Sequence, residues 1–298
     1  MDADLIGLSS NAWGLADAEK ICKSTSCPTV LGGQGALWNG YDDGRCFDHV
    51  VRGDGELALQ AIIDGKAPAK VFSMRVPDLD QLNPPDRGNC TATVPILTSR
   101  GCPFSCAFCS SKAQWGIPRL HSVGWIMADI HDCVKRYPNA KEFNILDDLW
   151  AYPKDRLKAF RDAWMKAGYH RRFKLRGFAR SNTITKELIA DMKMMGFSRI
   201  RFGAESGSNR MLKLLNKGET VEDHQRAIDL AKENFFPISA SFMRGMPGET
   251  PEDRKATLDF IARNKGKLSV EGDYVFKAFP GAQLWSGEDP LTTDMRVR

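Results

Sequence analysis

The sequence has no apolar run that approaches the ~18 residues needed to span a bilayer. Its start, Met1 to Leu8, lacks the basic segment and the small-residue cleavage site of a secretory signal peptide. A strong charge of either sign is also missing, because 42 basic and 37 acidic residues leave a formal net charge of +5. These absences argue against a membrane or a nucleic acid as the main partner. We therefore expect a cytoplasmic protein.

The sequence also gives no reason to expect disulfides, although it has eight cysteines. A chain of 298 residues is far above the size that depends on disulfide staples, and it carries no export signal. Three of the thiols stand in one stretch, Arg100-Gly-Cys-Pro-Phe-Ser-Cys-Ala-Phe-Cys-Ser110, with the spacing C-x3-C-x2-C. Cys102, Cys106 and Cys109 can bind three irons of a 4Fe-4S cluster and leave the fourth iron open for chemistry.

A structural zinc site is the alternative for these thiols, with Cys90 as the fourth ligand, because structural zinc takes four nitrogen or sulfur ligands. The resulting spacing, C-x11-C-x3-C-x2-C, lacks the paired knuckles that are usual for zinc. Iron content decides between the two. The other thiols are scattered along the chain and are more typical of packing residues: Cys22, Cys27, Cys46 and Cys133.

From about residue 91 the sequence alternates between apolar runs and helix-like stretches. Such a series is typical of buried parallel strands joined by helices, and six units of this spacing predict an α/β fold with a partial (β/α)6 TIM-like barrel. Polar loops then follow the strands at one working rim. The six expected strands are Val94–Leu97, Phe143–Leu146, Phe173–Phe178, Arg199–Phe202, Ile238–Phe242 and Tyr274–Phe279.

A shorter α/β series precedes this barrel. Its apolar runs end in glycine-rich turns, which predicts a Rossmann-like or flavodoxin-like half-domain of parallel strands. Between residues 66 and 90 the prolines cluster and the periodicity disappears, which predicts a linker. We divide the chain into an α/β piece at 1–65, a linker at 66–90, a barrel at 91–285 and a C-terminal tail at 286–298. In the first piece we expect strands at Asp4–Ser9, Thr29–Leu31 and His49–Val51, and helices at Ala16–Lys23 and Leu57–Ile63.

Besides the cysteine loop, the motifs of the chain are Leu5-Ile-Gly-Leu-Ser9, Val30-Leu-Gly-Gly33, Val51-Arg-Gly-Asp-Gly-Glu56, Leu146-Asp-Asp148, Arg180, Phe202-Gly-Ala-Glu-Ser-Gly207, Asn216-Lys-Gly218, Met243-Arg-Gly-Met-Pro-Gly-Glu-Thr250 and Phe279-Pro-Gly281. In their order and spacing the chain resembles the radical S-adenosylmethionine (SAM) enzymes, in the branch that carries an N-terminal cobalamin-binding domain. The resemblance implies a 4Fe-4S cluster that cleaves SAM reductively to a 5′-deoxyadenosyl radical. It further implies an electron donor such as flavodoxin or ferredoxin, and methylation or another radical modification of a small-molecule substrate at an unreactive carbon.

The resemblance also implies which residues contact SAM. A carboxylate suits the ribose hydroxyls or the methionine ammonium group, and a guanidinium suits the methionine carboxylate. The expected contacts are Phe108 beside the adenine, Asp147 and Asp148 at the amino group, Arg180 at the carboxylate, Glu205 with the adjacent Ser206 at the ribose, and Phe242 and Met243 along the adenine.

The strands of the expected barrel also carry several basic residues. If Glu205 points into the barrel, the period of two along a strand places Arg199 and Arg201 on the same inward side. By the same rule Arg180 brings other basic residues with it. We therefore hypothesise a basic inner wall and an anionic group in the substrate or in a second cofactor. The alternative is that some of these residues are solvated at the strand entrances. The basic wall would also include Lys174 and Arg176. The alternative instead places Lys174 and Arg199 in solvent at the strand entrances.

The N-terminal piece departs from the family pattern. A full cobalamin domain has five strands and often an Asp-x-His-x-x-Gly loop beneath the corrin, whereas this piece resembles only the last three strands. We expect a truncated relative and leave cobalamin binding open. Two alternatives remain: a cobalamin-independent radical SAM enzyme, of the methylthiotransferase or oxidative cyclase type, and a non-catalytic fragment that acts as a binding subunit. A methylthiotransferase would need a second cluster, for which Cys22, Cys27 and Cys46 are poorly spaced.

Overall fold

The computed structural model describes residues 3–90 and 92–287. The chain forms two compact units, and it passes between them several times along its length. The first unit takes its residues from Met1–Pro77, Pro103–Pro118 and Lys277–Arg298, and the second from Asp78–Cys102 and Arg119–Phe276. The cysteine loop is therefore divided, with Cys102 in the second unit. Most of the predicted C-terminal tail, from residue 288 on, lies outside the described residues.

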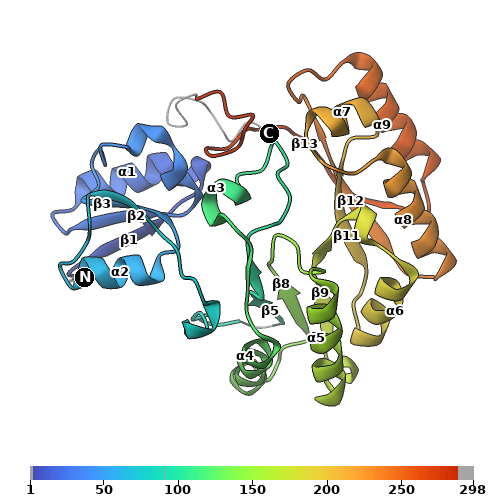
Figure 1. The fold of residues 1–298 in the computed structure, drawn as a ribbon, viewed down its shortest axis with the longest axis horizontal. Helices are drawn as coiled ribbons and strands as arrows, with labels where there is room; N and C mark the ends of the chain where they lie inside the picture. The colour runs from blue at the N-terminus through green and yellow to red at the C-terminus, as the bar shows by residue number, and fades with distance from the viewer. Residues whose placement is uncertain (1–2, 91, 288–298) are drawn as a thin grey trace. The chain divides into compact units, whose positions relative to one another are not determined.

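The first unit is built on a four-stranded parallel sheet whose strands follow one another in chain order. Helices cover its two faces (Figure 1). Leu31 packs with Leu15 of one helix, whereas its neighbour Val30 packs with Ala58 of the other. This alternation confirms the predicted α/β layering. The elements are β1 (Ile6–Ser9), α1 (Leu15–Ser24), β2 (Thr29–Gly32), β3 (His49–Gly53), α2 (Glu56–Ile63), β4 (Val71–Met74) and α3 (Ser111–Trp115).

Strand β4 corrects the prediction of a linker at residues 66–90. It pairs in parallel with β3, from Val50 opposite Val71 to Gly53 opposite Met74. Four residues are too few for a periodic pattern to stand out between prolines, which is why the sequence did not reveal this strand. The half-sheet consequently has one strand more than predicted.

The second unit contains the predicted series of parallel strands. They form two sheets, with the orders β5-β8-β9 and β10-β11-β12-β13, and a parallel bridge joins Leu175 to Phe197 between them. The sixth run was predicted too late, at Tyr274–Phe279. Three of the seven residues in the observed strand are Ser, Glu or Asp, so no apolar run marks it. The strands are β5 (Thr93–Ile96), β8 (Glu142–Ile145), β9 (Lys174–Arg176), β10 (Phe178–Ala179), β11 (Ile200–Glu205), β12 (Ile238–Arg244) and β13 (Ser269–Val275).

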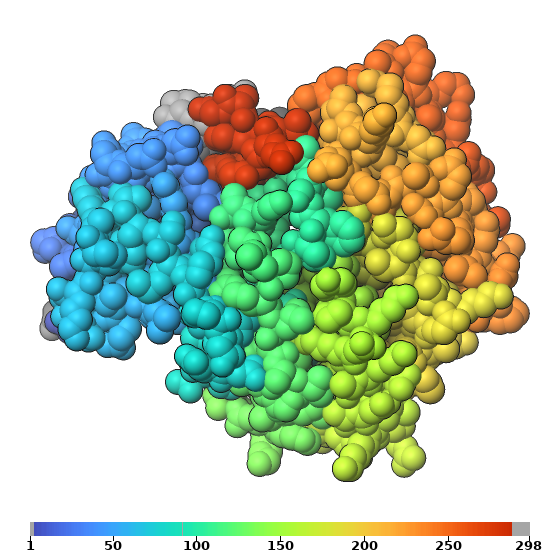
Figure 2. All heavy atoms as spheres, in the orientation of Figure 1, coloured from blue at the N-terminus to red at the C-terminus, as the bar shows by residue number. Residues whose placement is uncertain are grey.

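The helices of the second unit lie outside its strands (Figure 1). Helices α4, α5 and α6 pack side by side, and they form the continuous green to yellow surface of Figure 2. No helix in the described part of the chain has the length and apolar character that crossing a bilayer would require. The helices are α4 (Val123–Arg136), α5 (Lys154–Lys166), α6 (Lys186–Met195), α7 (Asn209–Leu214), α8 (Val221–Glu233) and α9 (Pro251–Arg263).

Alternation along β11 separates the core of the second unit from its inner face. Ile200 and Phe202 are buried among the residues that pack between strands and helices. Arg201, Gly203 and Glu205 alternate with them and belong to the opposite face. The polar residues of the strand ends are thus placed on the inner face, where the predicted site lies.

Candidate functional site

Three of the predicted site motifs lie at the carboxyl ends of strands in the second unit. Asp147 and Asp148 follow β8, Arg180 follows β10, and Glu205 is the last residue of β11. Because the strands run parallel within their sheets, these ends share the working edge of the fold. Phe108 belongs to the first unit and is not part of this group.

Both carboxylate oxygens of Asp147 accept hydrogen bonds from residues at the start of the cysteine loop. Its Oδ1 accepts the backbone N–H groups of Thr98 (2.7 Å) and Ser99 (3.1 Å), and its Oδ2 accepts both hydroxyls, that of Ser99 at 2.7 Å. Burial to 4% exposure raises the pKa of Asp147, and the four hydrogen bonds oppose that rise. A carboxylate has about four acceptor sites, so none is left for an ammonium group. We assign Asp147 to holding the loop.

A second set of hydrogen bonds joins the two ends of the same loop. β6 (Ser99–Arg100) pairs antiparallel with β7 (Arg119–Leu120), and the N–H of His121 donates to the carbonyl of Thr98 at 3.0 Å. Arg156 of α5 donates from Nε to the carbonyl of His121 at 3.1 Å and from Nη2 to the carbonyl of Thr98. Both ends of the loop are therefore fixed in the second unit. No motif pointed to Arg156, which lies in an ordinary amphipathic helix.

Asp148 lies next to the first cysteine of the loop. Its Oδ2 accepts the backbone N–H of Gly101 at 3.1 Å. Asp148, unlike Asp147, is exposed enough to meet a ligand. Of the predicted acidic pair, it is the member whose position fits a role at the SAM amino group.

The other two cysteines of the loop are held within the first unit. The N–H of Cys109 donates to the carbonyl of Cys106 at 3.1 Å, and the N–H of Ser111 donates to Sγ of Cys109 at 3.4 Å. Backbone N–H groups aimed at sulfur are typical of thiolates that bind iron. Gln34, in the glycine-rich turn after β2, donates from Nε2 to Oγ of Ser110 at 2.5 Å. The first unit thus supports the part of the loop that carries Phe108.

Glu205 belongs to a row of four buried charges. Nζ of Lys217 lies 3.2 Å from Oε1 of Glu205 and 3.4 Å from Oε2 of Glu219. Nη2 of Arg180 lies 3.2 Å from the same oxygen of Glu219 and donates to the carbonyl of Lys217. Cations and carboxylates alternate along the row, which is the arrangement that buried charges require.

Two neutral groups continue this row toward helix α8. Ser181 donates from Oγ to Oε1 of Glu219 at 2.7 Å and lies 2.7 Å from Nδ1 of His224. Nε2 of His224 lies 3.1 Å from the carbonyl of Ala204. Burial lowers the pKa of His224 to about 4. Burial alone would raise the pKa of Glu219, but the charges of Lys217 and Arg180 outweigh it and lower that pKa.

Of the residues in this row, only Glu205 and Arg180 were predicted as site residues. The sequence signal that could have found two of the others is Asn216-Lys-Gly-Glu219, where a lysine and a glutamate flank a glycine directly after a helix. Ser181 and His224 leave no local signal, because their roles depend on contacts between distant segments.

The turn after Glu205 is packed tightly on helix α9. The N–H of Gly207 donates to Oγ1 of Thr257 at 2.9 Å, and Oγ of Ser206 lies 3.2 Å from the same atom. A Cβ atom at Gly207 would lie 2.7 Å from Cα of Thr257, so only glycine allows this approach. The hydroxyl of Ser206 is buried against Thr257. Its predicted contact with SAM gains no support from this position.

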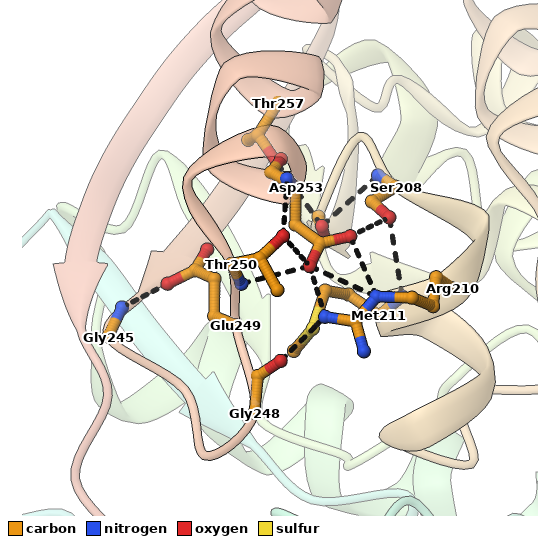
Figure 3. A network of polar contacts seen from close by, with 10 residues as sticks. Ser208, Arg210, Met211, Gly245, Gly248, Glu249, Thr250, Asp253 and Thr257 are labelled. Carbon is orange, nitrogen blue, oxygen red and sulfur yellow. Dashed lines mark hydrogen bonds and ion pairs between the residues drawn. The ribbon is translucent and has the colours of Figure 1, made fainter.

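The Gly-Met-Pro-Gly-Glu-Thr motif is joined to the same turn through Asp253 of α9 (Figure 3). Asp253 accepts from Oγ of Ser208 at 2.6 Å and from the guanidinium of Arg210. It also caps α9 through the N–H of Thr250 at 3.0 Å, and Arg210 donates to the carbonyl of Gly248. The bond from Arg210 holds the pKa of Asp253 well below its usual range. This network fixes the loops that follow β11 and β12.

Phe242 and Met243, which were predicted to lie along the adenine, lie on opposite faces of β12. Phe242 is buried against Phe260 of α9, with ring centroids 6.2 Å apart. Its side chain therefore belongs to the core. Met243 alternates with it and lies on the inner face.

The predicted basic wall is neutralised. Arg201 forms a bidentate pair with Glu271, with both N–O distances at 2.7 Å. Nε of Arg176 lies 2.7 Å from Oε1 of Glu142. The prediction of a basic inner wall was therefore wrong, and the hypothesis of an anionic substrate or second cofactor that rested on it loses its support. The remaining residues of the wall are exposed, as the alternative expected: Lys174 and Arg199.

Comparison with known families identifies this arrangement. The model of the radical SAM superfamily matches residues 96–261, more than half of the chain. The chain belongs to the radical SAM superfamily. This membership confirms the family and the α/β radical SAM fold predicted from the sequence.

Individual curated proteins match the chain over most of its length. An uncharacterized methyltransferase of Pyrococcus horikoshii is 28% identical, over 95% of this chain and 69% of the relative. An anaerobic magnesium-protoporphyrin IX monomethyl ester cyclase of Rubrivivax gelatinosus is 24% identical, over 71% of this chain and 44% of the relative. The chain thus spans about two thirds of the first relative and less than half of the second.

Two solved structures share the fold of the chain. The radical SAM methyltransferase TsrM from Kitasatospora setae has a TM-score of 0.77 at 17% identity, over 95% of this chain and 64% of TsrM. The cobalamin-dependent radical SAM enzyme OxsB has a TM-score of 0.65 at 20% identity, over 87% of this chain and 43% of OxsB. At these identities the likeness establishes the fold.

Membership of the radical SAM superfamily implies a 4Fe-4S cluster and SAM as cofactors. Within residues 3–90 and 92–287 no three His, Cys, Asp or Glu side chains form a ready metal-binding group. The donor chemistry of the loop nevertheless fits a cluster: it offers three thiols, none in a disulfide, and a backbone N–H donated to Sγ of Cys109. The ligand role of Cys102, Cys106 and Cys109 remains a prediction.

Proposed function

We propose that the chain is a radical SAM methyltransferase that modifies an unreactive carbon of a small-molecule substrate. The observation that carries the proposal is the buried row of charges that holds Glu205 at the strand edge shared with Asp148 and Arg180. Membership of the superfamily, a relative named as a methyltransferase and the fold shared with TsrM support it. When bound, the cluster supplies an electron and an open iron for the reductive cleavage of SAM.

The residues of the second unit would bind and orient SAM. Asp148 would accept hydrogen bonds from its amino group, and Glu205 from the ribose hydroxyls. Arg180 already forms an ion pair with Glu219 and donates to the carbonyl of Lys217, but a guanidinium has five N–H donors and can also serve the SAM carboxylate. Cys102, Cys106 and Cys109 would hold the cluster, with Phe108 beside the adenine.

The first unit would bind a corrinoid as the methyl carrier. Its strands run parallel, and ligands of such sheets bind at the carboxyl ends of the strands. At this edge Gly33 has φ +80°, and a Cβ atom there would lie 2.7 Å from the carbonyl oxygen of Ser10. Because Gly33 has no side chain, a ligand can approach the backbone of this turn closely. TsrM and OxsB, which share the fold, were both solved with cobalamin.

Anaerobic iron-sulfur reconstitution followed by incubation with SAM, a low-potential reductant and cobalamin tests the proposal. The products to measure are 5′-deoxyadenosine, S-adenosylhomocysteine and bound corrinoid. We expect 5′-deoxyadenosine and S-adenosylhomocysteine together with bound corrinoid, because one SAM would supply the radical that takes the hydrogen atom and a second would supply the methyl group. Deoxyadenosine without corrinoid would indicate a cobalamin-free radical enzyme, and the absence of both nucleoside products would contradict SAM chemistry. The Cys106→Ala variant is the control, because it removes one cluster ligand.

A further inference from the structure

We infer that Lys217 is a positioning residue, which holds the carboxylate of Glu205 in place for the ribose hydroxyls of SAM. The inference rests on the proposed function, because it takes Glu205 as the ribose ligand. It concerns a lysine to which the sequence assigned no role.

The backbone directs the side chain of Glu205 back over its own strand. Glu205 has φ +64°, a left-handed conformation that is unusual for a residue other than glycine, asparagine or aspartate. The pairing of β11 with β12 shifts its register between Gly203 and Glu205. An ideal Cβ atom at Gly203 would lie only 2.1 Å from Oε1 of Glu205. The carboxylate therefore covers Cα of Gly203 on the inner face.

Lys217 meets the carboxylate at that point. Its Nζ lies 3.2 Å from Oε1 of Glu205, and the same Cβ atom at Gly203 would lie 3.4 Å from this nitrogen. Within the described part of the chain no group donates to Oε2 of Glu205. One oxygen is thus fixed by the ammonium group, and the other is available to accept from a ligand. A buried carboxylate that is satisfied on one side only is suited to bind a hydroxyl pair.

Lys217 is itself held from several sides. Its N–H donates to the carbonyl of Leu212 at 2.9 Å, and its carbonyl accepts from Arg180. Its ammonium group is shared with Glu219, 3.4 Å away. Without this cation Glu205 and Glu219 would face each other as like charges, which would drive the carboxylate of Glu205 away from Gly203. A fixed lysine between two carboxylates therefore sets the position of Glu205 before SAM arrives.

Binding of SAM and of its 2′,3′-dideoxyribose analogue to the reconstituted holoprotein tests this inference. We expect the wild-type protein to prefer SAM by about tenfold, the effect of charge-assisted hydrogen bonds. Lys217→Met should remove most of this preference, and Lys217→Arg should restore part of it. Arg87→Met is the matched control, because it breaks the buried Arg87–Asp129 pair (2.6 Å) elsewhere in the same unit and should leave the preference unchanged.

Two results with Lys217→Met would overturn the inference: a preference equal to that of the wild type, or an equal loss of affinity for both ligands, which indicates a general structural role. If this variant does not fold, Gly203→Ala replaces it, because it keeps Lys217 and puts a methyl group where Oε1 lies. Gly203→Ala with the wild-type preference would also refute the inference. A wild-type protein that prefers SAM but yields neither nucleoside product would instead contradict the proposed function alone.

Discussion

Two carboxylates lie buried at the carboxyl ends of parallel strands in the second unit, and they differ in how many hydrogen bonds they accept. Asp147, after β8, receives four hydrogen bonds from Thr98 and Ser99. Glu205, at the end of β11, is held by one ammonium group at one oxygen. Their exposed fractions are similar, at 4% and 8%. Burial therefore does not distinguish the two carboxylates, whereas the number of occupied acceptor sites does.

The backbone shows the same contrast. Asp147 follows a regular strand, whereas Glu205 adopts the left-handed region after a register shift. Strained residues persist where the surrounding structure holds them, and they are common at ligand sites. Lys217, Gly203 and the packed turn at Gly207 provide that support. We conclude that Asp147 stabilises the loop, and the contrast supports the proposal that the Glu205 region binds a ligand.

Removing Asp147 should have the largest effect on stability. Asp147→Ala leaves two backbone N–H groups and two hydroxyls without their acceptor, and each buried unsatisfied donor is costly. We expect the free energy of unfolding to fall by about 3 kcal/mol or more, with reduced iron uptake, in urea denaturation and iron analysis. Asp148→Ala is the control and should change stability by less than about 1 kcal/mol. An Asp147→Ala variant as stable as the wild type would contradict the structural role of Asp147.

Acidification should destabilise the Glu205 region through His224. The pKa of His224 is about 4 in the fold, against about 6.5 in the unfolded chain, so the unfolded chain binds the proton first. The stability from this histidine is complete above pH 6.5 and is lost as the pH falls toward 4, by up to about 3 kcal/mol. Burial also lowers the pKa of His121, which adds to the trend.

Urea denaturation at several pH values measures this dependence. His224→Gln should flatten the curve between pH 6.5 and 4, whereas replacement of the exposed His131 should leave it unchanged. An equally steep curve for His224→Gln would show that other groups cause the acid sensitivity.

A methyl group on the turn after Glu205 should have an intermediate effect. Gly207→Ala places a Cβ atom 2.7 Å from Cα of Thr257, so α9 must shift. We expect a loss of about 2 kcal/mol in the free energy of unfolding, typical of overpacking, together with weaker SAM binding. Gly55→Ala is the control, because no atom lies within 4 Å of its Cβ position. Tight packing of this turn would be disproved by a Gly207→Ala variant with wild-type stability.

Neutralising Glu205 should have the smallest effect on stability and a clear effect on binding. Glu205→Gln keeps the shape of the side chain and removes a charge that serves a single internal partner. We expect stability to change by about 1 kcal/mol or less and the affinity for SAM to fall at least about tenfold. Calorimetry and equilibrium binding measure the two quantities. If the variant lost stability but bound SAM normally, Glu205 would be a structural residue like Asp147.

Sequence reasoning located the strands that carry apolar runs and missed those that do not. Strand β13 was placed too late in the sequence because Glu271, which pairs with Arg201 and Ser239, does not add to an apolar run. The basic wall was mispredicted for the same reason, since Arg201 and its carboxylate partner are 70 residues apart. Partners at such separations are set by the pairing of strands and cannot be read locally.

The acidic pair shows where the site prediction reached its limit. Asp147 and Asp148 are adjacent and chemically identical, so the sequence assigned both to one role. Only the fold shows that Asp147 meets Thr98 while Asp148 meets Gly101 beside the first cysteine. The cysteine spacing, by contrast, stands in one short stretch of sequence, and the role of Glu205 was assigned from the resemblance of its motif to the family. Their identification required no knowledge of distant contacts.

Metal analysis combined with electron paramagnetic resonance tests the central claim most directly. The anaerobically reconstituted chain should bind about four irons and four sulfides, as one cubane cluster requires. Reduction should give a cluster signal that changes when SAM is added, because SAM binds the open iron. One zinc per chain, or an iron signal that SAM does not alter, would contradict the account.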